Sequence, residues 1–456
     1  MSLSWSSWSS WSSWSSSSMM GLVWSLVRQG PAAVGEGCHT CFVDAVEAAT
    51  KRPMTTVDLA KFDLALPTEE HVMLRDQVRA FVKAEVEPQA LDFDRRERFN
   101  LPLFRKLGEL GLLGITVPED KGGAGMDATA AVIAHEEISA ADPGFCLAYL
   151  AHSMLCVNNL AYNASAEQCA RWLPKLITGE HVGAMGMSEP AVGTDVMGLK
   201  TMAVRTGEHY VANGRKMWIT NGVVDDETRS PADVMLFYAR TGGHDDRPQI
   251  TSFVAERGMG GYGVGQKIHD KCGMRGSNTA EMVLEDVNIP VANRIGEDGG
   301  AVKCMMRNLA LERLTLAAMS LGIARRSIEI MVQYANDRIA FGKPLNEFGQ
   351  IQRHIADSYA EYMACRAYVY DTARRMPLDA YGNRLDSDGV KLVSSTMGKN
   401  VADRAMQVLG GYGYVGEYVV ERLWRDAKLL EIGGGTIEAH QKNMTRDLTR
   451  GPFPWA

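Results

Sequence analysis

The chain has 456 residues, of which 46% are hydrophobic and 23% are charged, with a net charge of −7 at pH 7. This composition is typical of a globular protein with two or three structural units, each with its own core. The acidic balance argues against nucleic acid as a partner. No run of 18 apolar residues occurs, so we predict no membrane span.

The first 18 residues are a Ser/Trp repeat in which tryptophan recurs at a period of three. Low-complexity sequence of this kind cannot build a core. No acidic residue precedes Glu36, which favours an organelle transit peptide, although arginine is sparser than such peptides prefer. We interpret residues 1–55 as a mitochondrial presequence, with a disordered tail or a mis-assigned start as the alternative, and expect a mitochondrial matrix protein.

The eight cysteines are scattered, and Cys38 and Cys41 form the only CxxC pair. No second pair completes a zinc site, so we predict no metal centre. We expect reduced cysteines in an intracellular compartment.

The chain between residues 60 and 180 is predicted to be an all-helical N-terminal domain. The first helix starts after Pro67, carries Leu74, Val78 and Val82 on one stripe, and ends before Pro88. Residues 181–295 contain short alternating runs separated by Gly, Asp and Asn turns, which predict an antiparallel β domain rather than a βαβ alternation.

Long helical patterns return after residue 296. Four amphipathic helices, at 299–336, 349–375, 386–410 and 416–429, predict a C-terminal helical bundle over 296–450. The predicted fold class is therefore mainly α with a central antiparallel β domain, placed between a helical N-terminal domain and a C-terminal four-helix bundle.

Glu312 lies inside the most apolar of these helical patterns, with Leu311 and Leu314 beside it. Burial disfavours the charged form of a carboxyl group and raises its pKa, which makes it a better proton acceptor near neutral pH. The alternative is a Glu312 that pairs with Arg307 or Arg313 on a wet face. The pattern by itself leaves both open.

Three further stretches could carry chemistry. Gly411–Gly416 matches GxGxxG, but it follows a helix and not a strand, so a Rossmann unit is excluded. Ser188–Asp195 is a polar, turn-forming segment that could hold a phosphate or a flavin edge, or be a plain surface loop. Lys216–Gly222 places Trp218 at a strand end, where tryptophan is usually core and less often covers a flat cofactor.

The sequence resembles the acyl-CoA dehydrogenases from about residue 63 to 450. Six segments fall in the order and spacing of that family: Ser188–Thr194, Trp218–Thr220, Lys271–Ser277, Arg338–Gly342, Gln407–Gly413 and Leu430–Thr436. His152–Asn158 and Leu311–Ala317 most resemble the members that act on isovaleryl-CoA.

The resemblance implies a homotetramer that binds FAD non-covalently and without a Rossmann unit. It places Arg338 and Phe341 across a subunit contact, where an arginine suits the diphosphate because its planar donors stay charged. The implied cofactor-binding residues are Met187, Ser188, Gly193, Thr194, Trp218, Ile219, Thr220, Arg338, Phe341, Gln407, Gly410, Gly411, Thr436 and Glu438.

The implied reaction is α,β-dehydrogenation of an acyl-CoA, with electrons passed to electron-transferring flavoprotein. Most members carry the base just before a Gly-Thr pair, at the position of Gly434, whereas the isovaleryl and long-chain members carry it where Glu312 stands. Glu312 is therefore the predicted catalytic base, and Glu431 is a decoy. The implied substrate-binding residues are Thr194, Leu311, Arg313, Gly433 and Gly434.

The two glycines replace bulkier side chains and predict a pocket wide enough for a short branched acyl chain. Ala310, Lys303 and Gly349 depart from the family pattern at positions that bear on the CoA and adenosine contacts, and Val223–Pro231 is an insertion. Rival interpretations are a straight-chain or medium-chain dehydrogenase, an acyl-CoA oxidase, which usually carries a further C-terminal domain, and a non-catalytic acyl-CoA-binding scaffold.

Overall fold

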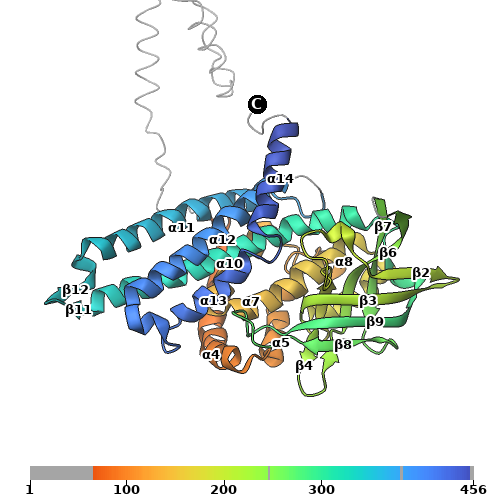
Figure 1. Cartoon of the computed structure of the whole chain (residues 1–456), viewed down its shortest axis with the longest axis horizontal. Coiled ribbons are helices and arrows are strands. Elements are labelled where there is room, and N and C mark those ends of the chain that lie inside the picture. Colours follow the sequence, from red (N-terminus) through yellow and green to blue (C-terminus); the bar gives the residue numbers. More distant parts are fainter. Residues whose placement is uncertain (1–64, 245–246, 381–383, 452–456) are drawn as a thin grey trace, which may run out of the picture. The chain divides into compact units, whose positions relative to one another are not determined.

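The computed structural model describes residues 65–244, 247–380 and 384–451. The predicted presequence, residues 1–55, lies outside them. The described chain runs from helices to a sheet and back to helices (Figure 1). This order confirms the predicted fold class of two helical parts with a β part between them.

Five of the N-terminal helices begin at a capping side chain. Thr68, Asn100, Asp127, Asp142 and Ser165 each accept a hydrogen bond from the backbone N–H three residues later. The helices of this part are α3 (Glu69–Phe81), α4 (Glu87–Arg96), α5 (Leu101–Glu109), α6 (Ala128–Ala141), α7 (Pro143–Leu150), α8 (Asn158–Asn163) and α9 (Ala166–Ile177).

A π-helical segment, Ala151–Val157, joins α7 to α8. The continuous helical run Pro143–Asn163 is long and apolar enough to cross a membrane, but 89% of its most apolar window is buried inside the protein. Such burial is expected of the central helix of a core.

The β part is a twisted sheet whose neighbours are mostly antiparallel. Its path is β10–β7–β6–β2–β3–β9–β8, and β1 joins it by pairing with β6. The pairings of β6 with β1 and with β2 are parallel, an exception to the antiparallel expectation. The strands are β1 (Gly183–Gly186), β2 (Met202–Thr206), β3 (His209–Thr220), β6 (Val234–His244), β7 (Arg247–Glu256), β8 (Tyr262–Lys267), β9 (Thr279–Pro290) and β10 (Arg294–Ile295).

The insertion predicted at Val223–Pro231 forms a small hairpin of β4 (Val223–Asp225) and β5 (Ser230–Pro231). Asp226 at its turn binds Lys267 Nζ of β8 at 2.7 Å. Arg98, which follows α4, approaches the other oxygen of Asp226 at 3.5 Å. The hairpin is therefore fastened both to the sheet and to the N-terminal helices.

The C-terminal helices pack around α10, a single helix of 37 residues (Ala301–Asp337). It contacts α6 on one side and α11 (Gly349–Arg375), α12 (Arg384–Leu409) and α13 (Val420–Leu430) on the others. Gly322 permits the crossing with α6, because a Cβ there would lie 2.1 Å from Ser139 Oγ and 2.3 Å from Glu136 O. The last helix is α14 (Ile437–Arg450).

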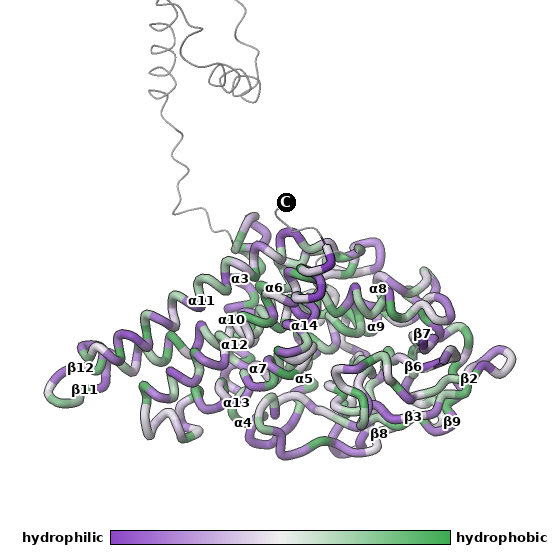
Figure 2. The backbone as a smooth tube through the Cα atoms, turned by 45° about the horizontal axis from the view of Figure 1, so that its top comes forward, coloured by the Kyte–Doolittle hydropathy of each residue, from purple (hydrophilic) through white to green (hydrophobic). Residues whose placement is uncertain are grey.

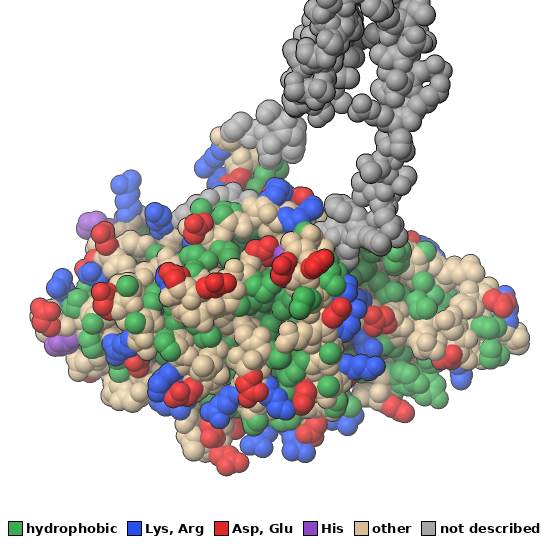
Figure 3. All heavy atoms as spheres, turned by 180° about the vertical axis from the view of Figure 1, so that it is seen from behind, with side chains coloured by type: hydrophobic (Ala, Val, Ile, Leu, Met, Phe, Trp, Pro, Cys, Tyr) green, Lys and Arg blue, Asp and Glu red, His purple; other side chains and the backbone are tan. Residues whose placement is uncertain are grey.

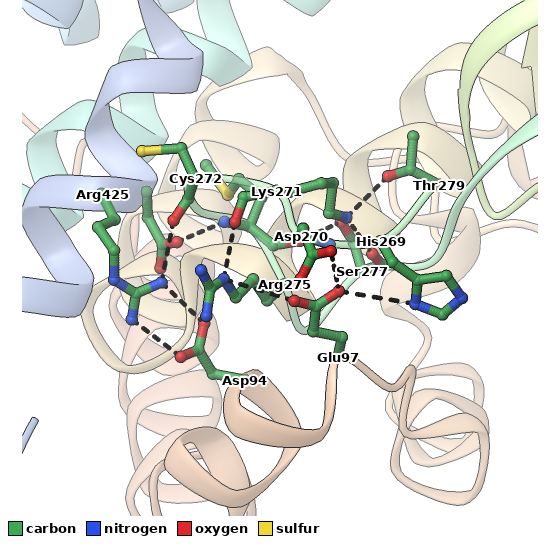
Figure 4. A network of polar contacts seen from close by, with 12 residues as sticks. Asp94, Glu97, His269, Asp270, Lys271, Cys272, Arg275, Ser277, Thr279 and Arg425 are labelled. Carbon is green, nitrogen blue, oxygen red and sulfur yellow. Dashed lines mark hydrogen bonds and ion pairs between the residues drawn. The ribbon is translucent and has the colours of Figure 1, made fainter. Parts of the chain in front are cut away.

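A polar network ties the three parts together (Figure 4). Arg425 of α13 binds Asp94 of α4 at 2.9 Å and the Cys272 carbonyl at 3.2 Å. Glu97, just after α4, accepts the N–H of Asp270 at 3.0 Å. The loop between β8 and β9 is thus held between the first and last helical parts.

Polar and apolar residues alternate along α11, as expected of a helix with one wet face (Figure 2). Acidic and basic side chains are interspersed on the face opposite that of Figure 1 (Figure 3).

Candidate functional site

Glu312 lies in α10 among apolar side chains and is only 8% exposed. Burial raises the pKa of its carboxyl group to about 7, although the charges of Arg313 and Lys391 oppose the rise. Its Oε2 atom has no hydrogen-bond partner among the described residues. The wet-face alternative does not describe this side chain, and a buried carboxyl that titrates near neutrality can act as a proton acceptor.

The loop between α13 and α14 runs past this carboxyl group. Gly434 has a φ of +67°, and a Cβ on it would lie 3.5 Å from Glu312 Oε1 and 2.3 Å from Leu316 Cδ1. Glycine is therefore required here both by the backbone conformation and by the close approach of Leu316. The decoy Glu431 instead pairs with Lys428 of its own helix at 2.6 Å.

Buried polar side chains bind the backbone of this loop at Gly435. The carbonyl oxygen of Gly435 accepts from Lys391 Nζ at 3.1 Å and from His440 Nε2 at 3.0 Å. Asp388 binds His440 Nδ1 at 2.6 Å and Arg313 at 3.0 Å. Sequence reasoning named only Arg313 of this group. Lys391 and Asp388 share a turn of α12, but nothing in their spacing predicts that they meet residues 435 and 440.

Two segments expected at the flavin lie side by side on the β part. The Met217 N–H donates to the Ser188 carbonyl at 2.9 Å. Glu189, next to Ser188, pairs with buried Lys216 at 2.8 Å and accepts the N–H groups of Lys200 and Thr201. These contacts fix the turn that carries Gly193 and Thr194, both of which are exposed.

Trp218 is the most informative residue of this surface. It is 61% exposed and has a φ of +64°, where the register of β3 against β9 is irregular. A bulky residue rarely adopts this conformation, which costs about 1–3 kcal/mol and clusters at ligand sites. An exposed indole beside a turn with free backbone suits a flat aromatic cofactor. Ile219 is different, because its side chain is buried in the sheet and only its backbone could meet a ligand.

Arg338 and Phe341 lie far from Glu312. Arg338 follows α10 and is 26 residues beyond Glu312, which corresponds to about 40 Å at about 1.5 Å per residue. Phe341 stands beside it at the tip formed by β11 (Ile339–Ala340) and β12 (Lys343–Pro344), and is 96% exposed (Figure 1). One chain cannot bring Arg338 and Glu312 to the same end of one cofactor.

A cleft of about 710 Å³ lies near this tip and is lined by Arg338, Tyr334, Tyr412 and Tyr418, among others. Gly410 and Gly411 border the same region and have open space where a Cβ would be, so their backbone is accessible. Gln407 precedes them on α12 and is exposed. The structure thus brings Arg338, Gln407, Gly410 and Gly411 to one region, apart from the predicted cofactor residues on the β part.

The last two predicted cofactor residues begin α14. Thr436 caps this helix, with its Oγ1 accepting the Ala439 N–H at 3.3 Å, and Glu438 is exposed in the first turn. Among the predicted substrate residues, Leu311 and Arg313 are buried beside Glu312, whereas Gly433 lies next to Gly434 with its N–H bonded to the Leu429 carbonyl at 2.8 Å. In residues 65–244, 247–380 and 384–451 no cluster of three His, Cys, Asp or Glu could hold a metal ion.

The structure thus shows a buried carboxyl group with a glycine loop against it, and an exposed indole on the β part. Three family descriptions match the chain: the N-terminal domain of acyl-CoA dehydrogenase over residues 68–180, the middle domain over 184–287 and the C-terminal domain over 299–449. The chain belongs to the acyl-CoA dehydrogenase family and is an FAD-dependent oxidoreductase.

Curated relatives agree with this assignment. The chain is 41% identical over 378 residues to isovaleryl-CoA dehydrogenase, mitochondrial, of Pongo abelii, which covers 82% of this chain and 87% of that protein. It is 38% identical over 379 residues to 2-methylacyl-CoA dehydrogenase, mitochondrial, of Solanum tuberosum, which covers 82% and 89%.

Solved structures share the fold. Butyryl-CoA dehydrogenase from Megasphaera elsdenii superimposes with a TM-score of 0.78 at 32% identity, over 84% of this chain and 99% of that one. A glutaryl-coenzyme A dehydrogenase in complex with glutaryl-CoA gives a TM-score of 0.79 at 31% identity, over 84% and 95%.

Proposed function

We propose that this acyl-CoA dehydrogenase oxidises a short branched-chain thioester, isovaleryl-CoA, to 3-methylcrotonyl-CoA, with Glu312 as the base. The observation that carries the assignment is the position of the Glu312 carboxyl group against Gly434. The relatives named for isovaleryl-CoA support the substrate.

Glu312 takes the α-proton of the thioester in this scheme. The proton is weakly acidic, so the carbonyl oxygen must be stabilised as negative charge builds on it. The resemblance to the family assigns the Gly434 N–H as the backbone donor for the thioester oxygen, and the neighbouring Gly433 N–H is already bonded to the Leu429 carbonyl. Bound FAD supplies the acceptor for the hydride that leaves the β-carbon.

The residues on the β part would hold the flavin end of the cofactor. Trp218 would cover the ring system, and the turn from Met187 to Thr194, with Thr220, would present backbone and hydroxyl groups to its edge. A second group of residues would contact the diphosphate and adenosine part of the FAD bound to a second copy of the chain, since the length of α10 separates them from Glu312. These residues are Arg338, Phe341, Gln407, Gly410 and Gly411. Thr436 and Glu438 would complete the site. Such sharing requires an oligomer, which we propose to be a homotetramer.

The two glycines add no side chain of their own beside the base, and at Gly434 Leu316 Cδ1 lies only 2.3 Å from where a Cβ would be. Gly433 and Gly434 leave room beside the β-carbon, where the branch methyl of isovaleryl-CoA would lie. A single methylene in an apolar pocket is worth only about 1–3 kcal/mol, so straight C4–C6 thioesters should react more slowly and not be rejected. Ala310 and Lys303, near the start of α10, and exposed Gly349, followed by Gln350, are where CoA and adenosine contacts would differ from the family pattern.

We further propose electron-transferring flavoprotein as the electron acceptor and the mitochondrial matrix as the location. The mitochondrial relatives and the acid-poor N-terminus support the location. The β4–β5 hairpin would border the route of the acceptor and alter its docking. Peroxide formation in place of flavoprotein reduction would instead indicate an oxidase.

The test is an anaerobic titration of the purified enzyme with isovaleryl-CoA, monitored by bleaching of the flavin absorbance. Wild-type enzyme should bleach at once, and Glu312→Gln should keep its yellow colour and bind the thioester without bleaching. Turnover of branched and straight C4–C8 thioesters should peak at isovaleryl-CoA. Full turnover by Glu312→Gln, or a maximum at C8, contradicts the proposal.

A further inference from the structure

Lys391 is a fully buried lysine on α12, one of the largest side chains in the interior of the protein. Burial lowers the pKa of its ammonium group to about 8, because the charged form loses its hydration. Of the neighbouring charges that act on it, Glu312 raises that pKa most, Arg313 lowers it, and Glu431 and Asp388 contribute less. A cation this deep is costly, so its position beside the Glu312 carboxyl group calls for an explanation.

The hydrogen bonds of Lys391 connect it to the same loop as Glu312. Its Nζ donates to the Gly435 carbonyl at 3.1 Å, one residue after the glycine that faces the Glu312 carboxyl group. His440 Nε2 shares that carbonyl oxygen at 3.0 Å. Since a carbonyl can only accept, Nε2 is the donor in this contact, and Nδ1 lies 2.6 Å from Asp388 Oδ1.

The charges around Glu312 come from several elements. Arg313, on α10 itself, is matched by Asp388 of α12 at 3.0 Å, and Asp388 also serves His440 of α14. Glu431, at the end of α13, is matched by Lys428. Tyr238 of β6 is buried nearby, and burial raises its pKa, so it stays neutral. Arg313 and Lys391 are the two cations whose charges lower the pKa of Glu312, Arg313 by more; Arg313 is paired with Asp388, whereas the Lys391 ammonium group is bonded to the loop that faces Glu312.

We propose that Lys391 is a positioning residue of the dehydrogenation: its ammonium group holds the Gly434–Gly435 loop against Glu312 and favours the ionised, proton-accepting form of that carboxyl group. The proposal rests on the role of Glu312 as base. A buried carboxyl without a nearby cation would be strongly basic but mostly protonated at neutral pH, and therefore unable to accept a proton. Lys391 would keep a useful fraction of it ionised.

The experiment compares Lys391→Met, Lys391→Gln and Lys391→Arg in the FAD-loaded enzyme. Two quantities are measured: the acid limb of the pH profile of kcat/KM, and a difference-infrared titration of the protonated-carboxyl band that is absent in Glu312→Gln. An opposite charge near a carboxylate changes its pKa by about 1–3, so both midpoints should move up by about one pH unit or more in the Met and Gln variants. The Arg variant should stay close to wild type.

Lys399→Met is the matched control, because it removes the same charge from a partly exposed position of the same helix. Its midpoints should not move. Lys391→Gln keeps a donor for the Gly435 carbonyl, so it carries the test if the Met variant does not fold. Unchanged midpoints in a folded, flavin-loaded Lys391→Gln variant overturn the proposal.

The same set of variants separates this inference from the proposed function. If Glu312→Gln retains full turnover, the base has been assigned wrongly, and the role of Lys391 fails with it. If Glu312→Gln is inactive while the Lys391 variants titrate like wild type, only the inference about Lys391 fails.

Discussion

Gly434 and Glu312 face each other closely enough that a Cβ on the glycine would stand 3.5 Å from the carboxylate oxygen Oε1. The two residues are 122 positions apart in the chain and belong to different elements, the α13–α14 loop and α10. A carboxylate that projected from either position would reach the same space. If Glu312 is the base, as proposed, a base on the loop at position 434 would act on the same space as one on the helix.

This geometry predicts that the base can be moved. Gly434→Glu in the Glu312→Gln background should restore little activity by itself, because its Cβ would lie 2.3 Å from Leu316 Cδ1 and its φ is +67°. Adding Leu316→Ala removes the clash and should raise turnover by at least about tenfold, which corresponds to about 1.4 kcal/mol of barrier. Single-turnover bleaching of the flavin by isovaleryl-CoA measures the gain.

Gly433→Glu, with the same two background changes, is the control for that transfer. A Cβ at Gly433 meets only Leu429, at 3.6 Å or more, so the residue can be accommodated but is not directed at Glu312. Rescue by both positions would mean that any carboxylate in the loop suffices, and that the contact of Gly434 with Glu312 has no special role.

A second prediction concerns stability and pH. The pKa of Glu312 rises from 4.5 to about 7 on folding, so the folded state binds more protons than the unfolded state between these values. The free energy of unfolding therefore falls as pH rises from about 4.5 to about 7. Glu312→Gln removes this loss and should be more stable than wild type by about 1–3 kcal/mol above pH 7, with the difference shrinking toward pH 4.5.

Thermal or urea unfolding of the two proteins at several pH values checks this prediction. Glu431→Gln serves as the comparison, because Glu431 pairs with Lys428 near the surface and such pairs contribute about 0–1 kcal/mol. A constant difference between Glu312→Gln and wild type across the pH range would show that the carboxyl group does not titrate as its burial indicates.

A third prediction concerns Trp218. The indole is 61% exposed and its backbone is strained, so Trp218→Ala should change the unfolding free energy of the flavin-free protein by less than about 1 kcal/mol. The loss of an aromatic contact worth about 0.5–1.5 kcal/mol should weaken FAD binding by up to about tenfold. Equilibrium dialysis with FAD measures the affinity. Tighter or equal FAD binding by the variant would exclude the indole as a cover for the ring.

A fourth prediction concerns the buried pair of Lys216 and Glu189. Burial opposes ionisation of Glu189, but the Lys216 charge and the N–H groups of Thr201 and Lys200 outweigh it and lower its pKa. Lys216→Met would leave a buried carboxylate without its cation, which typically costs about 3–5 kcal/mol. The Lys216→Met/Glu189→Gln double variant should recover part of this loss.

Chemical denaturation of the single and double variants gives the coupling energy between Lys216 and Glu189. Because the pKa of Glu189 is lowered, its contribution to stability is present above the ordinary carboxyl pKa and is lost as pH falls below it. FAD retention should fall together with stability, since the pair shapes the turn after Ser188. Additive effects in the double variant would contradict the coupling.

The sequence by itself determined the fold class, helices before and after a β part, because the spacing of apolar residues along the chain is a local property; it did not indicate β1, β8 or α14. It also indicated, through the resemblance to the family, that the base is expected on the helix at Glu312 and not in the loop at Gly434, since both residues can be read without coordinates. It could not show that the helical domain predicted over 60–180 contains the π-helical segment Ala151–Val157, or that β6 pairs in parallel with β1.

Tertiary structure decided what surrounds the base. Lys391, Asp388 and His440 come from two helices, and only packing brings them to the Gly434–Gly435 loop. It also decided that Arg338 and Glu312 of one chain lie far apart, because one unbroken helix separates them. Burial and charge proximity depend on how distant segments pack, and no local pattern of residues encodes them.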